Sequence, residues 1–153
     1  KSDLWEGGHR IPLLATWPNV IIPGSHSGHL ICSTDLFATL ADMLGTTLPP
    51  HTAEDSFSFW HELSGKKTKK ESKERQSMVS VNGFFALRKN EWVFVDCKGS
   101  GGWTLPEETA KKLPDTQLYN LKNDTTQLQN VLISHPEIAW EMKRELEAIK
   151  TKG

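Results

Sequence analysis

The apolar positions in the first half of the chain predict one short strand and one helix. Residues 11–17 are almost continuously apolar and are followed by proline and glycine residues, a pattern typical of a strand buried on both faces. From Leu36 to Leu44, apolar side chains recur at spacings of one, three and four residues, which indicates an amphipathic helix. A Ser-Thr-Asp cluster at 33–35 would cap the start of this helix, and Gly45 would supply a left-handed residue at its end.

The second half of the chain predicts a small antiparallel sheet followed by a helix. Its expected strands are rich in β-branched and aromatic residues and comprise residues 77–81, 84–88, 91–96 and 117–121. The Asn82-Gly83 dipeptide favours a tight hairpin between the first two strands, although the second strand could instead continue past a bulge. The chain ends in a helix that begins near Pro136 and carries one apolar stripe, formed by Ile138, Met142, Leu146 and Ile149.

Composition and charge exclude several broad classes of protein. At 153 residues the chain can bury one modest core, so we expect one domain, or a domain with the edge of another. A hydrophobic content of 37% and a charged content of 24% are ordinary for a globular protein. The net charge of −1 gives no field that would attract nucleic acid, and no apolar run approaches the roughly 20 residues of a transmembrane helix. We therefore expect an α+β fold with no nucleic-acid partner and no membrane span.

A run of charged residues at 65–75 is open to two interpretations. Basic patches of this kind can bind nucleic acid, but acidic residues interrupt this one and no aromatic residues interleave with it. We therefore interpret the run as a solvated loop.

The polar residues of the first twelve positions identify no enzyme when they are considered by themselves. Lys1 would be a solvated cation at the terminus, and the glycine pair at 7–8 would be a tight turn that another segment approaches closely. Glu6 and Arg10 would form a structural ion pair, which is commoner than a catalytic one. His9 would be hydrogen-bonded or exposed.

Two histidines and two cysteines have the chemistry of metal ligands but lack the sequence context. His26 and His29 are spaced like possible ligands, but their loop offers no third one, so we assign both a structural role. Cys32 and Cys97 lie far apart and outside any metal motif, and we expect them to act as small buried hydrophobic residues.

Five segments of the chain match, in order, the sequence blocks of one enzyme family. Residues 1–12, KSDLWEGGHRIP, fit the block Lys-x-x-x-(aromatic or aliphatic)-Glu-Gly-Gly-x-Arg-x-Pro. The other matching segments are residues 17–24, 33–40, 86–92 and 118–130, with departures from the blocks at Asn19, Ala38, Thr125 and Gln127. Each block alone is weak. Together and in this order they resemble the C-terminal part of sulfatases, the sulfuric ester hydrolases of the alkaline phosphatase superfamily.

The resemblance implies a division of the chain and a set of site residues. Residues 1–64 would be the C-terminal end of the large α/β catalytic domain, and residues 65–153 a small α+β subdomain of antiparallel sheet with a packed C-terminal helix. Lys1 takes the position of the lysine that contacts the sulfate near its leaving oxygen, so we expect it to be catalytic and substrate-binding. His9 and Trp103, which follows a flexible glycine-rich loop, are further candidates for contact with substrate. For Trp103 we favour the alternative of a packed side chain in a plain connecting loop.

The resemblance also implies a formylglycine nucleophile held against a calcium ion. Formylglycine is made from the Cys or Ser of a Cys/Ser-x-Pro-x-Arg motif, and Cys32, Cys97 and Ser134 all lack that context. The early calcium-binding aspartates of the family are missing too. We therefore expect the chain alone to be inactive and to need an N-terminal catalytic portion. The lack of an initiating methionine and of a signal peptide likewise predicts numbering that starts inside a longer protein.

The function predicted for the longer protein is hydrolysis of an aryl or carbohydrate sulfate ester. One alternative is a related hydrolase of phosphate or phosphonate esters, because the missing portion decides the chemistry. The other is a non-catalytic binding module in which Lys1 is incidental, and a soluble chain that unfolds cooperatively would favour that module. The resemblance alone indicates a periplasmic or secreted protein.

Overall fold

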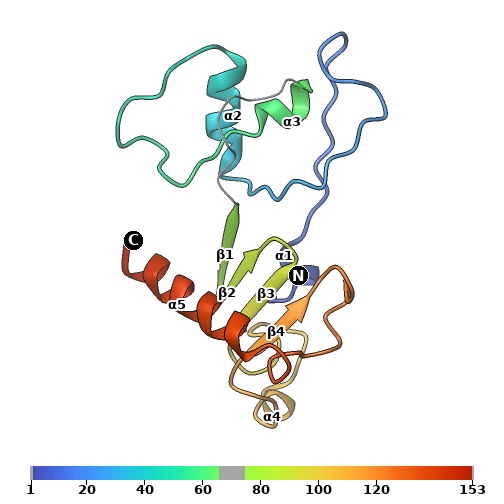
Figure 1. The fold of residues 1–153 in the computed structure, drawn as a ribbon, viewed down its shortest axis with the longest axis vertical. Coiled ribbons are helices and arrows are strands. Elements are labelled where there is room, and N and C mark those ends of the chain that lie inside the picture. The colour runs from blue at the N-terminus through green and yellow to red at the C-terminus, as the bar shows by residue number, and fades with distance from the viewer. Residues whose placement is uncertain (1, 66–74, 153) are drawn as a thin grey trace. The chain divides into compact units, whose positions relative to one another are not determined.

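The computed structural model describes residues 2–65 and 75–152, which fall into two compact units. The sheet unit consists of Lys1–Ile11 together with Gln76–Gly153, and the helical unit consists of Pro12–Arg75 (Figure 1). In sequence, the helical unit is therefore inserted between the first residues of the sheet unit and its strands. The charged run at 65–75 was interpreted from the sequence as a solvated loop. Most of this run lies outside the described residues.

The division predicted from the sequence, residues 1–64 and 65–153, concerns the longer protein and stays a prediction. Within this chain, residues 1–11 group with the strands and not with the residues that directly follow them.

Four strands of the described chain form one antiparallel sheet in the order β1-β2-β3-β4. They are β1 (Gln76–Val81), β2 (Phe84–Lys89), β3 (Trp92–Asp96) and β4 (Gln117–Asn120). Asn82 and Gly83 join β1 to β2 with φ angles of 52° and 81°, the left-handed backbone that a two-residue hairpin turn needs. The register places Ala86 opposite Val79 of β1 and Val95 of β3. The small α+β fold, its strands and the hairpin are thus confirmed.

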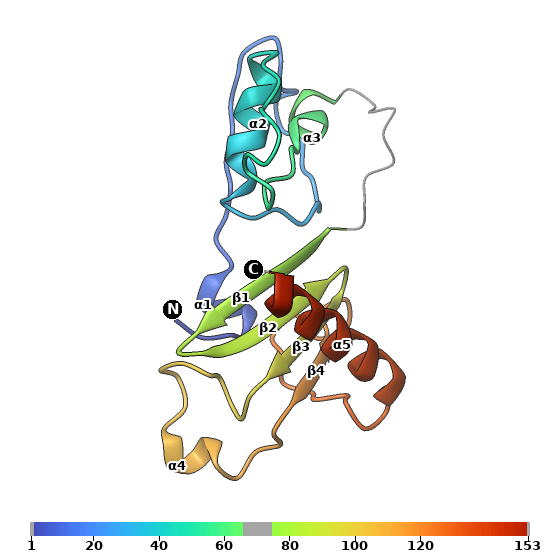
Figure 2. The ribbon, with the colours of Figure 1, turned by 90° about the vertical axis from the view of Figure 1, so that its left-hand side faces the viewer.

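A long C-terminal helix, α5 (Pro136–Lys152), covers one face of the sheet (Figure 2). Alternate strand residues and the apolar stripe of the helix form the core between them, namely Leu87, Phe94, Leu118, Ala139, Met142 and Leu146. Lys89 of β2 adds a polar contact, since its Nζ lies 3.2 Å from Glu141 and 2.8 Å from Glu145 on α5. The hydrogen bond to Glu145 raises the pKa of Lys89, so this contact stays charged at neutral pH.

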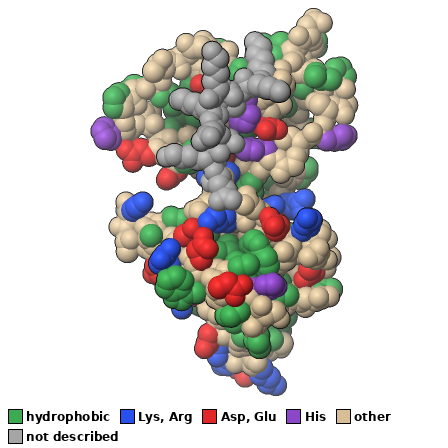
Figure 3. All heavy atoms as spheres, in the orientation of Figure 1, with side chains coloured by type: hydrophobic (Ala, Val, Ile, Leu, Met, Phe, Trp, Pro, Cys, Tyr) green, Lys and Arg blue, Asp and Glu red, His purple; other side chains and the backbone are tan. Residues whose placement is uncertain are grey.

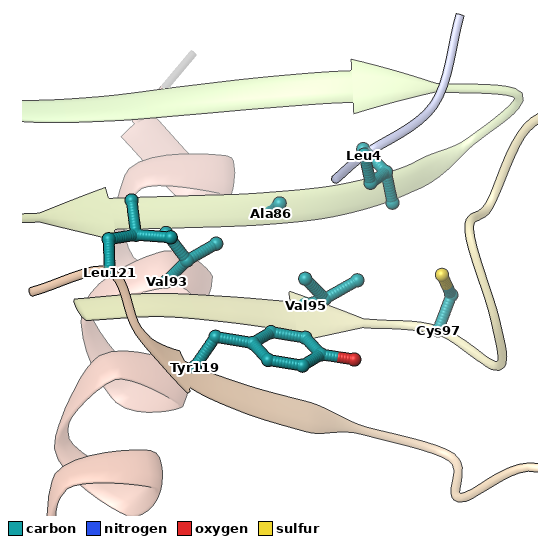
Figure 4. Close-up of a cluster of buried hydrophobic side chains, with 7 residues drawn as sticks. All are labelled: Leu4, Ala86, Val93, Val95, Cys97, Tyr119 and Leu121. Atoms are coloured by element: carbon teal, nitrogen blue, oxygen red, sulfur yellow. The ribbon is translucent and has the colours of Figure 1, made fainter. Parts of the chain in front are cut away.

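The opposite face of the sheet is covered by the first residues of the chain. Leu4 is fully buried there against side chains of β2, β3 and β4 and of the residues that follow them (Figure 4), namely Ala86, Val93, Val95, Cys97, Tyr119 and Leu121. A short helix, α1 (Glu6–His9), follows Leu4, and another, α4 (Glu107–Ala110), lies in the connection from β3 to β4. Complete burial of a leucine side chain contributes about 2 kcal/mol, so Leu4 anchors the segment that begins the chain.

The described residues of the helical unit form two helices, α2 (Asp35–Met43) and α3 (Trp60–Ser64). The sequence predicted α2, and Gly45 follows it in the expected left-handed conformation, with φ of 64°. Thr34 occupies the N-cap position of α2, but its side chain does not make the capping hydrogen bond that the sequence predicted.

Asp35, the first residue of α2, organises the described part of the helical unit. It is 1% exposed, and its Oδ2 accepts a hydrogen bond from the Cys32 N–H at 2.7 Å. Its Oδ1 accepts a hydrogen bond from the Phe57 N–H at 2.9 Å and pairs with the guanidinium group of Arg75 at 2.9 Å. The start of α2 is therefore held by one buried carboxylate that ties three segments together.

The apolar stripe of α2 points away from the core of its own unit. The helix buries small and polar residues, namely Asp35, Ala38, Thr39 and Ala41. Three of its large apolar side chains are 42% to 55% exposed, namely Leu36, Phe37 and Leu40, while Met43 is half-buried. Leu44, which directly follows the helix, is 79% exposed. Figure 3 shows hydrophobic side chains at several places on the visible surface of the described residues.

The prediction of a buried strand at residues 11–17 is wrong for this chain. The segment has no strand geometry, and Leu14 is 92% exposed. A strand buried on both faces needs neighbouring strands, and the described residues of the helical unit contain none. Among the described helices, none is long and apolar enough to cross a lipid bilayer.

Candidate functional site

The three residues predicted to contact substrate all belong to the sheet unit. Lys1 lies outside the described residues. The next residue, Ser2, donates its N–H to the Gly8 carbonyl at 3.2 Å, so the backbone directly after Lys1 is bound to α1. His9 is the last residue of α1, and Trp103 stands in the loop between β3 and α4.

The turn around α1 forms because Gly8 has no side chain. The Gly8 N–H donates to the Trp5 carbonyl at 2.8 Å. A Cβ atom on Gly8 would overlap with the backbone of Asp3, whereas a Cβ atom on Gly7 would meet no atom within 4 Å. The expected tight turn that another segment approaches closely is present, and Gly8 is the glycine at which the approach occurs.

Glu6 connects three of the sequence blocks that carry the resemblance. It is 4% exposed, and its Oε2 accepts a hydrogen bond from Arg88 Nη1 at 2.7 Å. Its backbone N–H donates to Gln127 Oε1 at 2.6 Å, and its Oε1 lies 3.6 Å from His9 Nε2. The ion pair expected with Arg10 is formed with Arg88 instead, because the folded sheet brings β2 up to α1.

The environment of Glu6 keeps this buried carboxyl group ionised. Burial raises the pKa of Glu6, but the hydrogen bond from His9 and the positive charge of Arg88 outweigh burial, so the pKa lies below the usual range of a glutamate. Glu6 is therefore a charged anchor for α1 and not a proton donor at neutral pH.

Replacing Glu6 by glutamine is expected to lower the free energy of unfolding by about 2 kcal/mol at neutral pH, because Arg88 loses a charged partner. Folding lowers the pKa of Glu6, so its stabilising contribution is present above the unfolded value, about 4.3, and is lost as pH falls through the lower folded value. Urea unfolding of both proteins across pH should show the difference shrinking in acid. Glu108→Gln, at a side chain 84% exposed, should show no such difference. A Glu6→Gln deficit that does not change with pH would contradict the role assigned to the charge.

Asp3 fixes the loop that carries Trp103. It is 4% exposed, its Oδ1 accepts the Thr104 N–H at 3.1 Å, and its Oδ2 accepts the Thr104 hydroxyl. The Ser100 carbonyl accepts the Leu4 N–H at 2.8 Å. Burial raises the pKa of Asp3, but the hydrogen bonds from Thr104, Ser100 and Trp103 outweigh it and hold the pKa below its usual range. The carboxylate therefore stays ionised while it binds the loop.

The glycine-rich loop at 99–102 is packed, although its composition predicted flexibility. Gly101 has φ of 66°, and a Cβ atom on it would lie 2.7 Å from Leu4 Cδ1. A Cβ atom on Gly102 would overlap with the Ser2 carbonyl. The glycines thus permit the loop to lie directly against the first residues of the chain, which brings the residue before Trp103 next to the residue after Lys1.

Gln117 holds the same loop from the side of the sheet. Its Nε2 donates to the carbonyls of Cys97 at 2.8 Å and Gly99 at 2.7 Å, and its Oε1 accepts a hydrogen bond from Trp5 Nε1 at 3.2 Å. Sequence reasoning missed Gln117 and Asp3 because their partners are distant in sequence. The signal available in the sequence was the glycine-rich loop, which indicates that another segment approaches closely but does not identify that segment.

Trp103 and His9 have different surroundings. The Trp103 side chain is 78% exposed, so the packed alternative is not observed. His9 is 29% exposed, with Nδ1 3.4 Å from the Asp3 carbonyl oxygen and Nε2 3.6 Å from Glu6 Oε1, so both ring nitrogens face its own segment. Contact of either side chain with substrate stays a prediction. The structure does bring the segments that carry Lys1, His9 and Trp103 together around Asp3.

The described residues do not fit the calcium ion that the resemblance implies. Calcium takes oxygen ligands, whereas the group of three potential ligands in the described chain is His29, His61 and Glu62, which is rich in nitrogen. Neither cysteine forms a disulfide, and Cys97 is buried as expected. Burial raises the pKa of the Cys97 thiol to about 11, so it is protonated and unreactive at neutral pH. Cys32 is half-buried.

Known proteins match this chain over nearly its full length, but no family model does. This chain is 33% identical over 155 residues to the N-acetylgalactosamine-6-O-sulfatase of Bacteroides thetaiotaomicron. The alignment covers 99% of this chain and 29% of that protein. A solved Bacteroides thetaiotaomicron structure from work on the metabolism of multiple glycosaminoglycans gives a TM-score of 0.59 and 30% identity, over 76% of this chain and 24% of its own. The structure of Ps i-CgsB shares the fold, with a TM-score of 0.70 at 22% identity over 95% of this chain and 30% of its own. The chain thus spans less than a third of each of these proteins.

Proposed function

We propose, from the premise that this chain is the C-terminal portion of a sulfatase, that the longer protein to which it belongs hydrolyses sulfate esters. The observation that carries the proposal is the match along 99% of the chain to a sulfatase of which it spans 29%. The contacts of Glu6 support it, because they join three sequence blocks that resemble the sulfatase pattern into one folded arrangement.

The exposed apolar surface of the helical unit supports an N-terminal catalytic portion as the partner of this chain. Leu36, Phe37 and Leu40 of α2 are 42% to 55% exposed, and residues 12–17 add further exposed apolar side chains. Several large exposed apolar side chains in one unit are typical of a surface that contacts other protein. We assign the contact to the missing portion because the relatives extend far beyond the segment that this chain matches.

Lys1 is the residue of this chain that we propose to act on the sulfate. An ammonium group beside the leaving oxygen stabilises the negative charge that develops there and can hold a proton for the leaving group. Asp3 and Glu6 are unsuited to proton donation because each is buried and ionised, and each is hydrogen-bonded within the chain. Their role is to hold the backbone from Ser2 to α1 in one place.

A calcium ion and a formylglycine are proposed as the cofactor and the nucleophile of the longer protein. The described residues fit neither of them, so we place the calcium ligands and the precursor motif upstream of this chain.

A carbohydrate sulfate is the substrate class that we favour over an aryl sulfate. Trp103 exposes 78% of its surface on a loop that Asp3 and Gln117 hold rigidly, and an exposed, fixed indole can stack on the apolar face of a sugar ring. The relative matched over 99% of this chain is named as acting on N-acetylgalactosamine 6-O-sulfate.

The proposal is tested by assaying the longer protein and the 153-residue chain side by side. We expect the longer protein to release sulfate from N-acetylgalactosamine 6-sulfate and from 4-nitrophenyl sulfate, and we expect the chain alone to release none. Preference for 4-nitrophenyl phosphate over the sulfate would favour the related phosphate hydrolase. A gene that encodes no upstream segment, with a chain that is soluble and unfolds cooperatively, would favour the binding module.

A further inference from the structure

Three side chains of the helical unit that can bind metals converge on one point. His29 comes from the loop before α2, and His61 and Glu62 come from α3. His29 Nδ1 lies 3.9 Å and His61 Nε2 3.4 Å from the same carboxylate oxygen, Glu62 Oε1. One potential ligand atom from each residue lies within 4.8 Å of the other two. The fold therefore supplies His29 with the further ligands that its own loop lacks.

Ser27 supports this cluster through two hydrogen bonds. Its hydroxyl donates to Glu62 Oε2 at 2.6 Å, which leaves Oε1 directed towards the two imidazoles. Ser27 Oγ also accepts the His29 N–H at 3.1 Å and so fixes the backbone of the first ligand. A ligand carboxylate that is held by a hydrogen bond through its other oxygen is the usual support around a protein-bound metal.

The two imidazole rings lie edge to face, and each has one nitrogen near Glu62 Oε1. Their centroids are 5.6 Å apart, and the planes meet at 83°, so each ring can direct one nitrogen towards Glu62 without overlap of the rings. Helix α3 is held in position by Trp60, whose ring lies 5.8 Å from that of Trp17. The side chains of His29, His61 and Glu62 are 27%, 23% and 33% exposed, which leaves room for an ion to enter.

A simple surface ion pair in the same unit looks different. His51 Nδ1 lies 3.1 Å from Glu54 Oε1, with side chains that are 90% and 71% exposed. That pair contains one histidine and one carboxylate, and the described chain places no third potential ligand beside it. In the cluster, nitrogens of two imidazoles lie near one carboxylate oxygen, and none of the three side chains is more than 33% exposed. Imidazole nitrogen and carboxylate oxygen are the donors that zinc accepts.

We propose that His29, His61 and Glu62 form a binding site for a divalent transition metal of the zinc class. Zinc lies about 2.0–2.2 Å from such nitrogen and oxygen ligands, so binding requires the three groups to close in by no more than about 1 Å. Water from solvent completes a tetrahedral shell. The ion would clip the loop at His29 to α3, which the Ser27–Glu62 hydrogen bond also joins across a separation of 35 residues. The described residues of this unit contain no strand and no disulfide that would do so.

The test measures zinc binding to the longer protein in the presence of excess calcium, so that an oxygen-rich site elsewhere is filled. Competition with a chromophoric chelator should show that the parent protein binds one zinc ion at this site. We expect the zinc affinity of this site to be at least tenfold lower in His61→Gln and in Glu62→Gln. Ser27→Ala, which removes support but no ligand, should weaken binding by a smaller factor. His51→Gln, in the ordinary surface pair, should bind zinc as the parent does.

Two further measurements keep loss of a ligand apart from loss of the fold. Circular dichroism and thermal unfolding with EDTA should be the same for His61→Gln and the parent, and zinc should raise the melting temperature of the parent only. Cobalt, used as a spectroscopic probe, should give visible absorption of a tetrahedral complex in the parent and not in the variant. Equal zinc affinity in the parent and in His61→Gln would overturn the proposal. Because the readout is metal binding, its outcome is independent of sulfate hydrolysis.

Discussion

Replacing Lys1 by alanine in the longer protein is expected to lower kcat for a sugar sulfate by about a hundredfold or more, with a much smaller change in KM. The physical reason is that the ammonium group is proposed to stabilise charge on the leaving oxygen, and that charge exists in the transition state and not in the bound substrate. Steady-state kinetics of the two proteins at saturating substrate measure the effect.

The leaving group provides the control for this interpretation. A nitrophenolate ion needs less stabilisation than a sugar alkoxide, so Lys1→Ala should cost less kcat with 4-nitrophenyl sulfate than with the sugar sulfate. Lys112→Ala, at an exposed lysine of the sheet unit, should leave both rates unchanged. A Lys1→Ala protein that retains the parent kcat on both substrates would show that Lys1 is incidental.

Replacing Gly8 by alanine is expected to lower the free energy of unfolding by about 3 kcal/mol, because the new methyl group would overlap with the backbone of Asp3. That backbone cannot move aside easily, since the Asp3 carboxylate is bound to Thr104 and the neighbouring Leu4 is fully buried. Urea unfolding followed by tryptophan fluorescence measures the change.

Gly7→Ala is the matched control, with the same chemical change one residue earlier in the same helix. A Cβ atom on Gly7 meets no atom within 4 Å, so we expect a change within about 0.5 kcal/mol. Equal stability of the two variants would mean that Asp3 does not lie against Gly8. The Gly8→Ala change should also reduce the activity of the longer protein, since Ser2 is bound to the carbonyl of this same residue.

The sequence predicted the elements that depend on local signals. The hairpin at Asn82-Gly83 follows from two residues that accept left-handed backbone, and α5 follows from Pro136 and a stripe with helical period. The turn at Gly8 could also be predicted, since two adjacent glycines indicate close approach. In each of these cases the information lies within a few neighbouring residues.

The features that the sequence did not predict depend on partners far away or outside the chain. The amphipathic helix α2 was predicted, but the pattern alone does not say what covers its apolar stripe, most of which the described residues leave exposed. Residues 11–17 fail as a strand because the described residues of the helical unit provide no neighbouring strand. Asp3 and Gln117 are decisive for the candidate site, yet no spacing along the sequence connects Asp3 to Thr104 or Gln117 to Trp5.

The contact between Glu6 and Gln127 joins positions that lie 121 residues apart. During synthesis, the segment that carries the candidate lysine leaves the ribosome first, and the strands and the glutamine that hold it leave much later. The segment cannot take its final place until Gln127 has been synthesised. A premature stop codon between Trp103 and Gln127 would therefore remove the partner of the Glu6 N–H while keeping every residue proposed here to touch substrate.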